Sequence, residues 1–152
     1  MASLRVVVHA SAAPQGSKRH VGRGIMVESC KRVKPFRQDV KFAALEARPD
    51  DWKMDGPFSI YVLFHFVRPK SHFTGKGKLK ASAPLHPTGR NVGDIEKLLR
   101  AVHDALSEVL FTDDSQVVDC YAAKLYAERP STIIHLHHVL TNKSLNRVSS
   151  IC

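Results

Sequence analysis

The sequence predicts a single α/β (α+β) domain in which two main helices pack on a mixed sheet of about four strands. Three observations lead to this prediction. The 152 residues are 43% hydrophobic, enough for one globular domain with its own core. Apolar residues recur at helical spacing in two segments, and four other segments have the composition of strands. In chain order the elements run strand, helix, strand, helix, strand, strand.

The first half of the chain is expected to hold two strands and a helix. Residues 4–9 form the first strand, and a loop rich in glycine and basic residues follows over 14–24. Helical spacing of apolar residues predicts a helix over 35–47, which Pro49 ends. Residues 58–67 are the strongest strand, and they are apolar on both faces. That pattern predicts a central strand covered on both sides.

The second half is expected to hold a loop, a helix and two strands. Residues 68–92 form a long loop of Gly, Lys and Pro, which we expect to be mobile in the free protein. Apolar spacing predicts a helix over 97–109. Strands are expected over 116–127 and 132–140. The remaining polar residues, 142–152, are expected to be a flexible tail, so the domain itself spans 1–141.

Composition indicates the class of partner. The formal net charge of +9 favours a polyanion such as DNA or RNA, because Lys and Arg gain affinity by releasing condensed counterions. A membrane is the weaker alternative, since no apolar stretch reaches the roughly 18 to 20 residues of a spanning helix. No signal peptide is recognised, so a cytoplasmic protein is expected. Three widely spaced cysteines argue against both a disulfide framework and a structural zinc site.

The positive charge is concentrated in two segments. Residues 14–37 hold seven Lys or Arg, and residues 68–90 hold six and no acid. Residues 94–128, in contrast, hold eight of the fourteen acids. This segregation predicts an acidic, metal-binding centre framed by basic loops that hold phosphates, although each basic run could also be an ordinary solvated surface. The residues predicted to contact DNA are Lys18, Arg19, Arg23, Lys70, Lys76, Lys78, Lys80, Lys97 and Lys124.

Four carboxylates flank the second predicted helix. Asp94 is a good N-cap for it, and Glu96 follows two positions later. Within a helix these two would point about 200° apart, so they converge only if Asp94 precedes the helix. Asp113 and Asp114 follow the helix. Three or four carboxylates in one pocket would recruit Mg²⁺ or Mn²⁺, and such an ion in a basic protein suggests hydrolysis of a phosphodiester.

Three short segments also carry a resemblance to a known family. They are Asp94-Ile95-Glu96-Lys97-Leu98-Leu99-Arg100, Asp104-Ala105-Leu106 and Asp113-Asp114-Ser115-Gln116-Val117. Together they resemble the signature of the RusA family of Holliday junction resolvases. Those proteins are small, homodimeric, Mg²⁺-dependent endodeoxyribonucleases, often phage-encoded. Residues 14–19 and 68–72 resemble segments of phage members, so the likeness covers roughly residues 5–138.

The resemblance implies roles for single residues. Asp94 and Asp114 match catalytic carboxylates of the family, and Glu96 stands where the family has another catalytic Asp. These three are the implied Mg²⁺ ligands, with Asp113 as an adjacent acid. Arg100 stands where the family has a catalytic Lys. The implied function is resolution of four-way DNA junctions by paired symmetric nicks, in a bacterial cell and from a C2 dimer.

Two departures from the family pattern keep a second interpretation open. Glu96 carries one more methylene than Asp, which moves the carboxylate by about 1.5 Å. Arg100 keeps the charge of Lys but cannot readily donate a proton. The alternative is therefore a non-catalytic or weakly catalytic protein of the same fold that binds branched DNA. A nuclease less selective for four-way junctions is a third possibility.

Several of these residues also have ordinary structural interpretations. Asp113 and Asp114 could simply form a turn. Arg100 could pair with Glu96 or Asp104 along the helix, and Lys124 could be a surface lysine. A separate group of histidines, His135, His137 and His138, could bind zinc, but strand or surface histidines are the favoured interpretation.

Overall fold

The computed structural model describes residues 2–16, 18–28 and 30–139. The predicted tail, 142–152, and the domain boundary at 141 lie outside the described residues. They therefore remain predictions.

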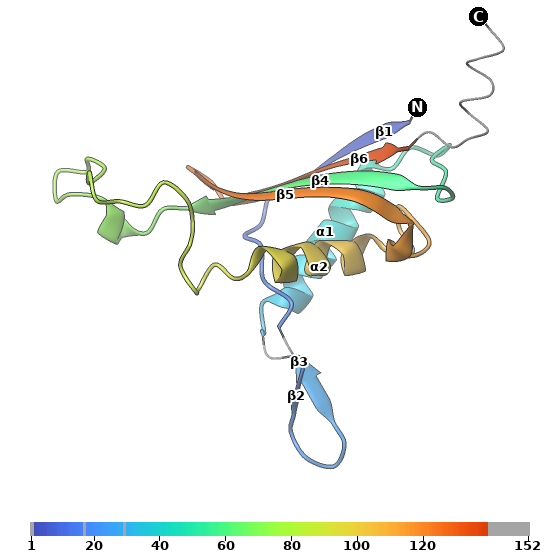
Figure 1. Ribbon diagram of the computed structural model, residues 1–152, viewed down its shortest axis with the longest axis horizontal. Coiled ribbons are helices and arrows are strands. Elements are labelled where there is room, and N and C mark those ends of the chain that lie inside the picture. The colour runs from blue at the N-terminus through green and yellow to red at the C-terminus, as the bar shows by residue number, and fades with distance from the viewer. Residues whose placement is uncertain (1, 17, 29, 140–152) are drawn as a thin grey trace, which may run out of the picture.

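The centre of the fold is a four-stranded mixed sheet (Figure 1). Its strands are β1 (Ser3–Val8), β4 (Phe58–Val67), β5 (Val117–Ala127) and β6 (Ser131–His138). They lie side by side in the order β1, β6, β4, β5. β6 pairs antiparallel with both β1 and β4, whereas β4 and β5 are parallel. The predicted fold class, sheet size and order of the main elements are confirmed.

Two helices cover the same face of this sheet, α1 (Val33–Ala47) and α2 (Ile95–Leu106) (Figure 1). Each turns its apolar side toward the strands: α1 buries Phe36, Val40 and Ala44, and α2 buries Leu98, Ala101 and Val102, among others. On the sheet side, alternate residues of three strands form the core: Phe58, Ile60, Val62, Phe64 and Phe66 of β4, Leu4, Val6 and Val8 of β1, and Ile134 and Leu136 of β6. Burial of this single face is the main force that holds the helices to the sheet.

The predicted covering of the central strand is only half right. β4 does lie between two other strands. Its second face is open, however, because both helices lie on the same side of the sheet. Tyr61 and Val67 on that face are 40% and 52% exposed. An outer sheet face with exposed aromatic and aliphatic side chains is thus left without a covering layer among the described residues.

Both helices begin earlier than their apolar spacing predicts. α1 begins at Val33, which places Pro35 inside its first turn. Proline is tolerated there because the first backbone N–H groups of a helix have no intrahelical partner. α2 begins at Ile95 with Asp94 at the N-cap position, as predicted, but the Asp94 side chain makes no capping hydrogen bond.

α2 also ends earlier than predicted, at Leu106 rather than Val109. The Ser107 hydroxyl donates to the His103 carbonyl oxygen at 3.0 Å, and Glu108 takes a left-handed conformation with φ of 63°. That conformation cannot continue a right-handed helix. Val109 remains buried in the following turn, which explains why its apolar character extended the predicted helix.

Two segments project from the body (Figure 1). One is an unpredicted hairpin of β2 (Lys18–His20), which lies within the expected 14–24 loop, and β3 (Met26–Glu28), which follows that loop. The other is the predicted 68–92 loop, which has internal structure of its own: a 3₁₀ turn, η1 (Lys70–His72), and a β-bridge between Phe73 and Leu79. Among the described residues, no helix combines the length and apolar character needed to cross a membrane.

Candidate active site

The candidate site begins at a tight turn before α2. Gly93 has φ of 95°, a conformation that favours glycine. A Cβ atom on this residue would also lie 2.6 Å from Cγ of Pro14, so the pyrrolidine ring packs directly on the Gly93 backbone. The positive φ of Gly93 and its missing side chain therefore allow the N-terminal segment to pack against the start of α2.

Two hydrogen bonds hold this junction together. The Gln15 backbone N–H donates to the Lys97 carbonyl oxygen at 3.0 Å. The Lys124 ammonium, on β5, donates to the Gly93 carbonyl oxygen at 3.0 Å. Lys124 is thus neither a free surface lysine nor simply a phosphate contact, because it ties the end of the sheet to the turn that carries Asp94.

Asp94 lies at this turn with its carboxylate directed to solvent. Its backbone is extended, so it stands before the helix, as convergence with Glu96 requires. One carboxylate oxygen lies 3.2 Å from the Lys97 ammonium, and the Asp94 side chain is 74% exposed. Exposed ion pairs of this kind contribute only about 0 to 1 kcal/mol. The Asp94 carboxylate therefore remains available to a cation or another ligand.

Glu96 and Arg100 lie one turn apart and share a face of α2, and both are exposed. The alternative in which Arg100 pairs with Glu96 or Asp104 is not what the structure contains. Among the described residues, the ion pairs are Arg37 with Asp104 and Lys97 with Asp94. The guanidinium of Arg100 is consequently free to meet an anion beside Glu96.

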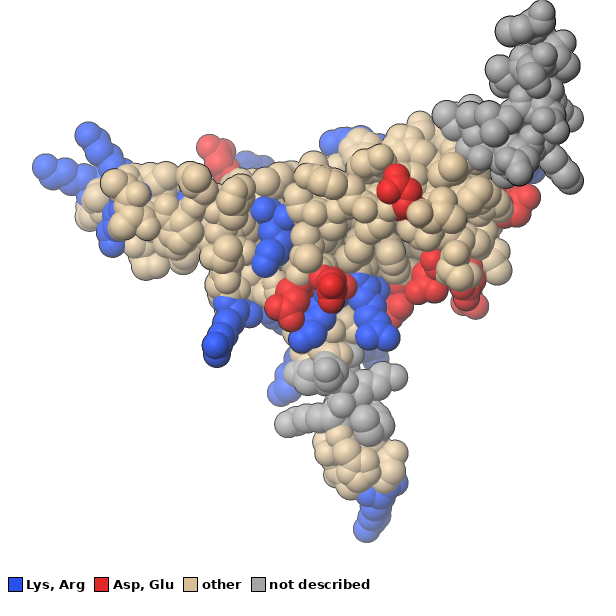
Figure 2. Space-filling view, viewed as in Figure 1, with Lys and Arg blue, Asp and Glu red and all other residues tan. Residues whose placement is uncertain are grey.

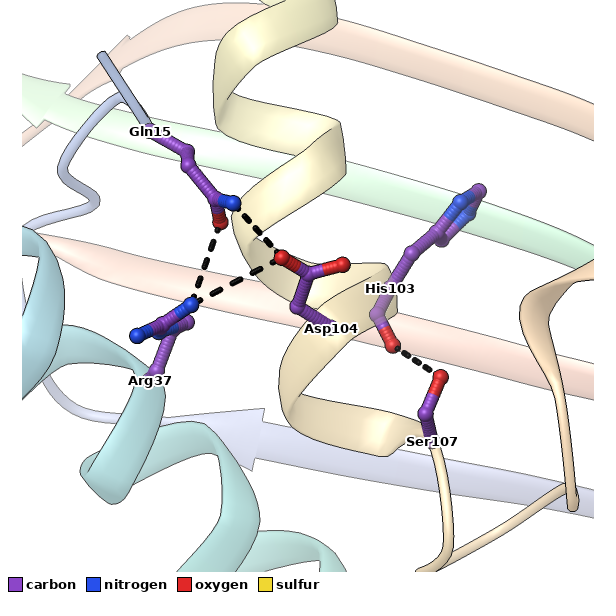
Figure 3. A network of polar contacts seen from close by, with 5 residues as sticks. All are labelled: Gln15, Arg37, His103, Asp104 and Ser107. Atoms are coloured by element: carbon purple, nitrogen blue, oxygen red, sulfur yellow. Dashed lines mark hydrogen bonds and ion pairs between the residues drawn. The ribbon is translucent and has the colours of Figure 1, made fainter. Parts of the chain in front are cut away.

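Asp104 takes part in a different network, on the side of α2 that faces α1 (Figure 3). Gln15 Nε2 donates to its carboxylate at 2.6 Å, and one Arg37 guanidinium nitrogen lies 3.6 Å from the same oxygen. The same Arg37 nitrogen donates to Gln15 Oε1 at 3.5 Å. The network joins the N-terminal loop, α1 and α2. Sequence reasoning missed it because these residues are far apart in the chain and Arg37 counted only as surface charge.

His103 points to the opposite side of α2 from this network (Figure 3). Burial lowers the pKa of its imidazole, while the Asp114 and Asp104 carboxylates raise it in part. Its Nε2 atom is buried and has no hydrogen-bond partner among the described residues. Asp114 begins the short helix over residues 114–116, and that short helix contacts α2.

Asp113 has a clear structural role in the turn after α2. It caps η2 (Asp114–Gln116) by accepting a hydrogen bond from the Ser115 backbone N–H at 2.9 Å. Hydrogen bonds from the side chain and backbone of Ser115 lower the pKa of the Asp113 carboxyl. The turn interpretation of Asp113 therefore holds.

Gln116 completes this turn. Its side-chain oxygen accepts from the Asp113 backbone N–H at 2.9 Å, the second half of a capping box. Its side-chain amide donates to the carbonyl oxygens of Met54 and Gly56, both at 2.9 Å. One side chain therefore joins the turn after α2 to the segment before β4, a role that its place in the sequence pattern did not reveal.

The structure separates the predicted carboxylates into two groups. Asp94 and Glu96 lie at the N-terminal end of α2, and the exposed Asp114 lies beyond its other end. From Asp94 to Leu106, the last residue of α2, the helix axis rises by about 18 Å. No group of three His, Cys, Asp or Glu side chains that could hold a metal ion forms among the described residues. The single pocket of carboxylates that we expected is therefore not formed within one chain.

The predicted DNA-contact residues surround this acidic region. Figure 2 shows Lys and Arg at the ends of both projections, and Asp and Glu side chains over α2 between them. Arg23 lies at the hairpin tip, and the predicted lysines at 70, 76, 78 and 80 lie on the exposed loop, with Lys80 Nζ donating to the Ser71 carbonyl oxygen at 2.9 Å. Lys18 and Arg19 lie in β2, and their side chains are outside the described part of the chain.

The three histidines of β6 do not share one face. His135 and His137 stack on the outer sheet face, with ring centroids 6.5 Å apart. The His138 ring instead packs on Trp52 and Phe58. They therefore lie apart from the acidic region as ordinary strand residues.

Comparison with known proteins adds a separate observation. A family model described as "Endodeoxyribonuclease RusA" matches residues 8–137, from the end of β1 to β6. The chain belongs to the RusA family. The matched residues include β4, β5, both helices and all of β6 except its last residue, whereas β1 is matched only at its last residue. The chain is also 33% identical over 132 residues to the "Uncharacterized protein YqaN" of Bacillus subtilis (strain 168), covering 86% of this chain and 89% of that protein.

Membership gives the RusA signature a structural explanation in this chain. The family is one of endodeoxyribonucleases, hydrolases that cut DNA internally. In the Asp-Ala-Leu segment, Ala105 and Leu106 are buried in the core, and Asp104 anchors the network with Gln15 and Arg37. Part of the RusA signature therefore builds the scaffold, whereas Asp94, Glu96, Arg100 and Asp114 are exposed.

Proposed function

We propose that this chain is a structure-selective endonuclease that resolves four-way DNA junctions with paired symmetric nicks, in recombination and repair. The observation that carries the proposal is the row of exposed acidic side chains at α2, placed between two basic projections in a member of an endodeoxyribonuclease family. Basic projections bind phosphates without regard to sequence, which suits recognition by shape. We place its action in the bacterial cytoplasm and its origin in a phage or prophage.

The proposed chemistry is hydrolysis assisted by Mg²⁺, or Mn²⁺ in its place. The three predicted ligands do not fit one ion within a single chain, because Asp114 lies beyond the other end of α2. Asp94 and Glu96 alone are an acceptable oxygen donor set, since Mg²⁺ keeps several waters and commonly binds through one or two carboxylates and substrate phosphates. When bound, such an ion polarises the phosphate and activates water.

The residues of the chain prepare this end of α2 for DNA. Lys124 and Pro14 fix the turn that carries Asp94. Lys97 would leave Asp94 for a DNA phosphate at little energetic cost, because their pair is exposed. Arg100 would neutralise charge that develops on the phosphate. Asp114, exposed in η2 beside α2, is proposed as a further carboxylate that cleavage requires.

A homodimer is part of the proposal, because two symmetric nicks call for two active sites. The outer face of the sheet supports it. Tyr61 and Tyr121 lie side by side there, with ring centroids 6.1 Å apart, and Tyr121 is 55% exposed. Together with Leu63, His135 and His137 they line a shallow hollow of about 410 Å³. Exposed aromatic side chains are enriched at subunit contacts.

The test is cleavage of a labelled synthetic four-way junction in Mg²⁺. The Asp94→Asn, Glu96→Gln and Asp114→Asn variants, together with an EDTA control, would be compared with the unchanged protein. Linear duplex and forked DNA would measure selectivity. Asp119→Asn is a matched control, because Asp119 is an exposed acid on β5 whose carboxylate, among the described residues, accepts a side-chain hydrogen bond only from the Ser59 hydroxyl.

The proposal predicts paired symmetric nicks that disappear in the three variants and in EDTA, while junction binding persists. Binding without cutting in Mg²⁺ and in Mn²⁺ would refute the enzymatic proposal and leave a branched-DNA-binding protein. Equal cutting of junctions, forks and duplex would instead identify a less selective nuclease. Cleavage by Asp114→Asn at the normal rate would remove Asp114 from the site.

A further inference from the structure

The tip of the β2–β3 hairpin combines projection, rigidity and exposed apolar side chains. The hairpin extends away from the sheet on the side of the helices, so its tip is separated from the core (Figure 1). Val21 and Ile25 flank the turn and are 51% and 55% exposed. Single exposed apolar residues are common on protein surfaces. Two branched aliphatic residues side by side at the end of a projecting element are not explained by packing.

Backbone hydrogen bonds hold the tip of the hairpin in a defined turn. The Val21 N–H donates to the Ile25 carbonyl oxygen at 3.0 Å, and the Ile25 N–H donates to the Gly22 carbonyl oxygen at 3.0 Å. Gly22, Arg23 and Gly24 all have positive φ, of 99°, 49° and 74°. These bonds hold Val21 and Ile25 next to each other and turn the chain within three residues.

His20 supports the turn from one side. Its ring nitrogens lie 3.3 Å from the Gly22 backbone nitrogen and 3.2 Å from the Gly24 backbone nitrogen. A neutral imidazole has one acceptor nitrogen, so the ring accepts from one of these N–H groups at a time. With this support, the apolar pair is presented on a pre-formed turn, which reduces the ordering cost on binding.

The charge around the tip indicates the kind of partner. Arg23 lies between the two apolar residues in sequence and is exposed at the tip, and Lys31 and Arg32 are exposed where the hairpin returns to the body. Figure 2 shows basic side chains at the end of this projection. Cations around a small apolar wedge match the chemistry of proteins that hold DNA phosphates and insert aliphatic side chains between base steps.

A branch point is the place in DNA where such a wedge meets least resistance. Insertion into a continuous duplex requires unstacking, at a cost of a few kcal/mol per base step. At a four-way junction the base pairs at the crossing lose a continuous stacking neighbour in at least part of the ensemble. The same apolar contact therefore contributes more binding free energy at a junction than on a linear duplex.

We propose that the hairpin tip is a wedge that places Val21 and Ile25 against the unstacked base pairs at a DNA branch point, with Arg23 on the adjacent phosphates. The proposal rests on the junction substrate of the proposed function and adds the element that distinguishes the branch from a duplex. It assigns the selectivity to the hairpin and the chemistry to α2. The two can therefore be separated by mutation.

The experiment uses full-length protein and a four-way junction with 2-aminopurine at a base pair next to the crossing. Binding of the unchanged protein should raise the 2-aminopurine fluorescence as that base unstacks. The double variant Val21→Ser/Ile25→Ser should abolish the rise and weaken junction binding on the order of tenfold. Its affinity for duplex should change less than about twofold. The conservative variant Val21→Leu/Ile25→Leu should retain the signal.

Two controls identify the cause of any loss. Phe42→Ser/Leu45→Ser removes a matched pair of exposed apolar residues from α1, at 69% and 44% exposure, and should leave both readouts unchanged. Arg23→Gln should weaken junction and duplex binding together and reduce the salt dependence by about one phosphate contact. Circular dichroism and Tm would verify that each variant is folded.

A normal fluorescence rise and normal junction affinity in the Ser double variant would overturn the wedge while leaving the nuclease proposal intact. An equal loss on junction and duplex would overturn it too, because the tip would then be a general DNA contact. If the unchanged protein binds a junction no better than a duplex, both the junction-selective nuclease and the wedge are refuted. The cleavage assay on junction, fork and duplex tests the nuclease proposal separately, because it does not involve the hairpin variants.

Discussion

Replacement of Gly93 by Ala tests the packing that carries Asp94. The new Cβ would stand 2.6 Å from Cγ and 2.7 Å from Cβ of Pro14, at a residue with φ of 95°. The backbone conformation costs about 1 to 2 kcal/mol for an L-residue. Overpacking against a ring adds about 1 to 3 kcal/mol, unless Pro14 moves and the adjacent Gln15 to Lys97 hydrogen bond breaks. We therefore expect Gly93→Ala to lower the free energy of unfolding by about 2 to 5 kcal/mol.

Two other glycines separate these contributions. Gly77 has φ of 78°, and a Cβ added there would meet no atom within 4 Å. Gly77→Ala should therefore lower the free energy of unfolding only by the cost of the backbone conformation, about 1 to 2 kcal/mol. Gly75 has neither a positive φ nor a near neighbour, so Gly75→Ala should change the free energy of unfolding by less than about 0.5 kcal/mol. Urea unfolding of the three variants should therefore give a graded series.

The same substitution should affect cleavage. A shift of about 1 Å at a reacting group can cost roughly 100-fold in rate, and the Gly93 turn directly precedes Asp94. Junction cleavage by folded Gly93→Ala should therefore fall far more than by Gly77→Ala. If Gly93→Ala were no less stable than Gly77→Ala, the close contact with Pro14 would be refuted. If it were less stable but cut at the normal rate, the turn would not position Asp94.

Three further predictions concern other parts of the molecule. Gln116→Ala should lower the free energy of unfolding by about 1 to 3 kcal/mol, because two carbonyl oxygens and the capping box lose their hydrogen-bond partner. In the same urea titration, replacement of the exposed Gln38 on α1 by Ala should have little effect. Burial lowers the pKa of the His103 imidazole, so on acidification the unfolded chain takes up this proton at a higher pH than the folded protein does. The free energy of unfolding of the unchanged protein should therefore fall as the pH drops from about 6.5 through the lowered pKa. In urea titrations over the same pH range, the midpoint of His103→Phe should fall less. Tyr121→Glu should shift the sedimentation coefficient from dimer toward monomer at micromolar concentration, with exposed Phe42→Glu as the control; a dimer unchanged by Tyr121→Glu would exclude the outer sheet face as the contact.

The elements that sequence reasoning predicted well are those with a strong local pattern. Residues 58–67 alternate large apolar side chains, and β4 occupies the same residues. Both helices follow their apolar spacing, with errors only at the ends. The end of α2 depends on the Ser107 hydroxyl and the backbone of Glu108, which hydrophobic periodicity does not register. The hairpin at 18–28 was missed because its strands have three residues each, which is too short for hydrophobic periodicity to detect.

For the candidate site, the sequence proposes residues but not their geometry. Asp94, Glu96 and Asp114 were recognised from their spacing and family resemblance. Their separation along α2 depends on where the helix begins and where the turn after it lies. The contacts that fix the site, such as Pro14 on Gly93 and Gln15 with Asp104, join residues up to 89 positions apart. A single sequence contains no local signal for such pairs.

The place of β6 in the sheet has a consequence for how the protein folds. β6 is the last described strand in the chain, yet it lies between β1 and β4 and is the partner of both. Ser3 pairs with His137, so the first strand has no neighbour in the sheet until nearly all the described residues have been synthesised. Contacts this distant in sequence slow folding. A ribosome-bound chain that stops before residue 131 would carry its basic projections without the complete sheet, so the domain can assemble only late in translation.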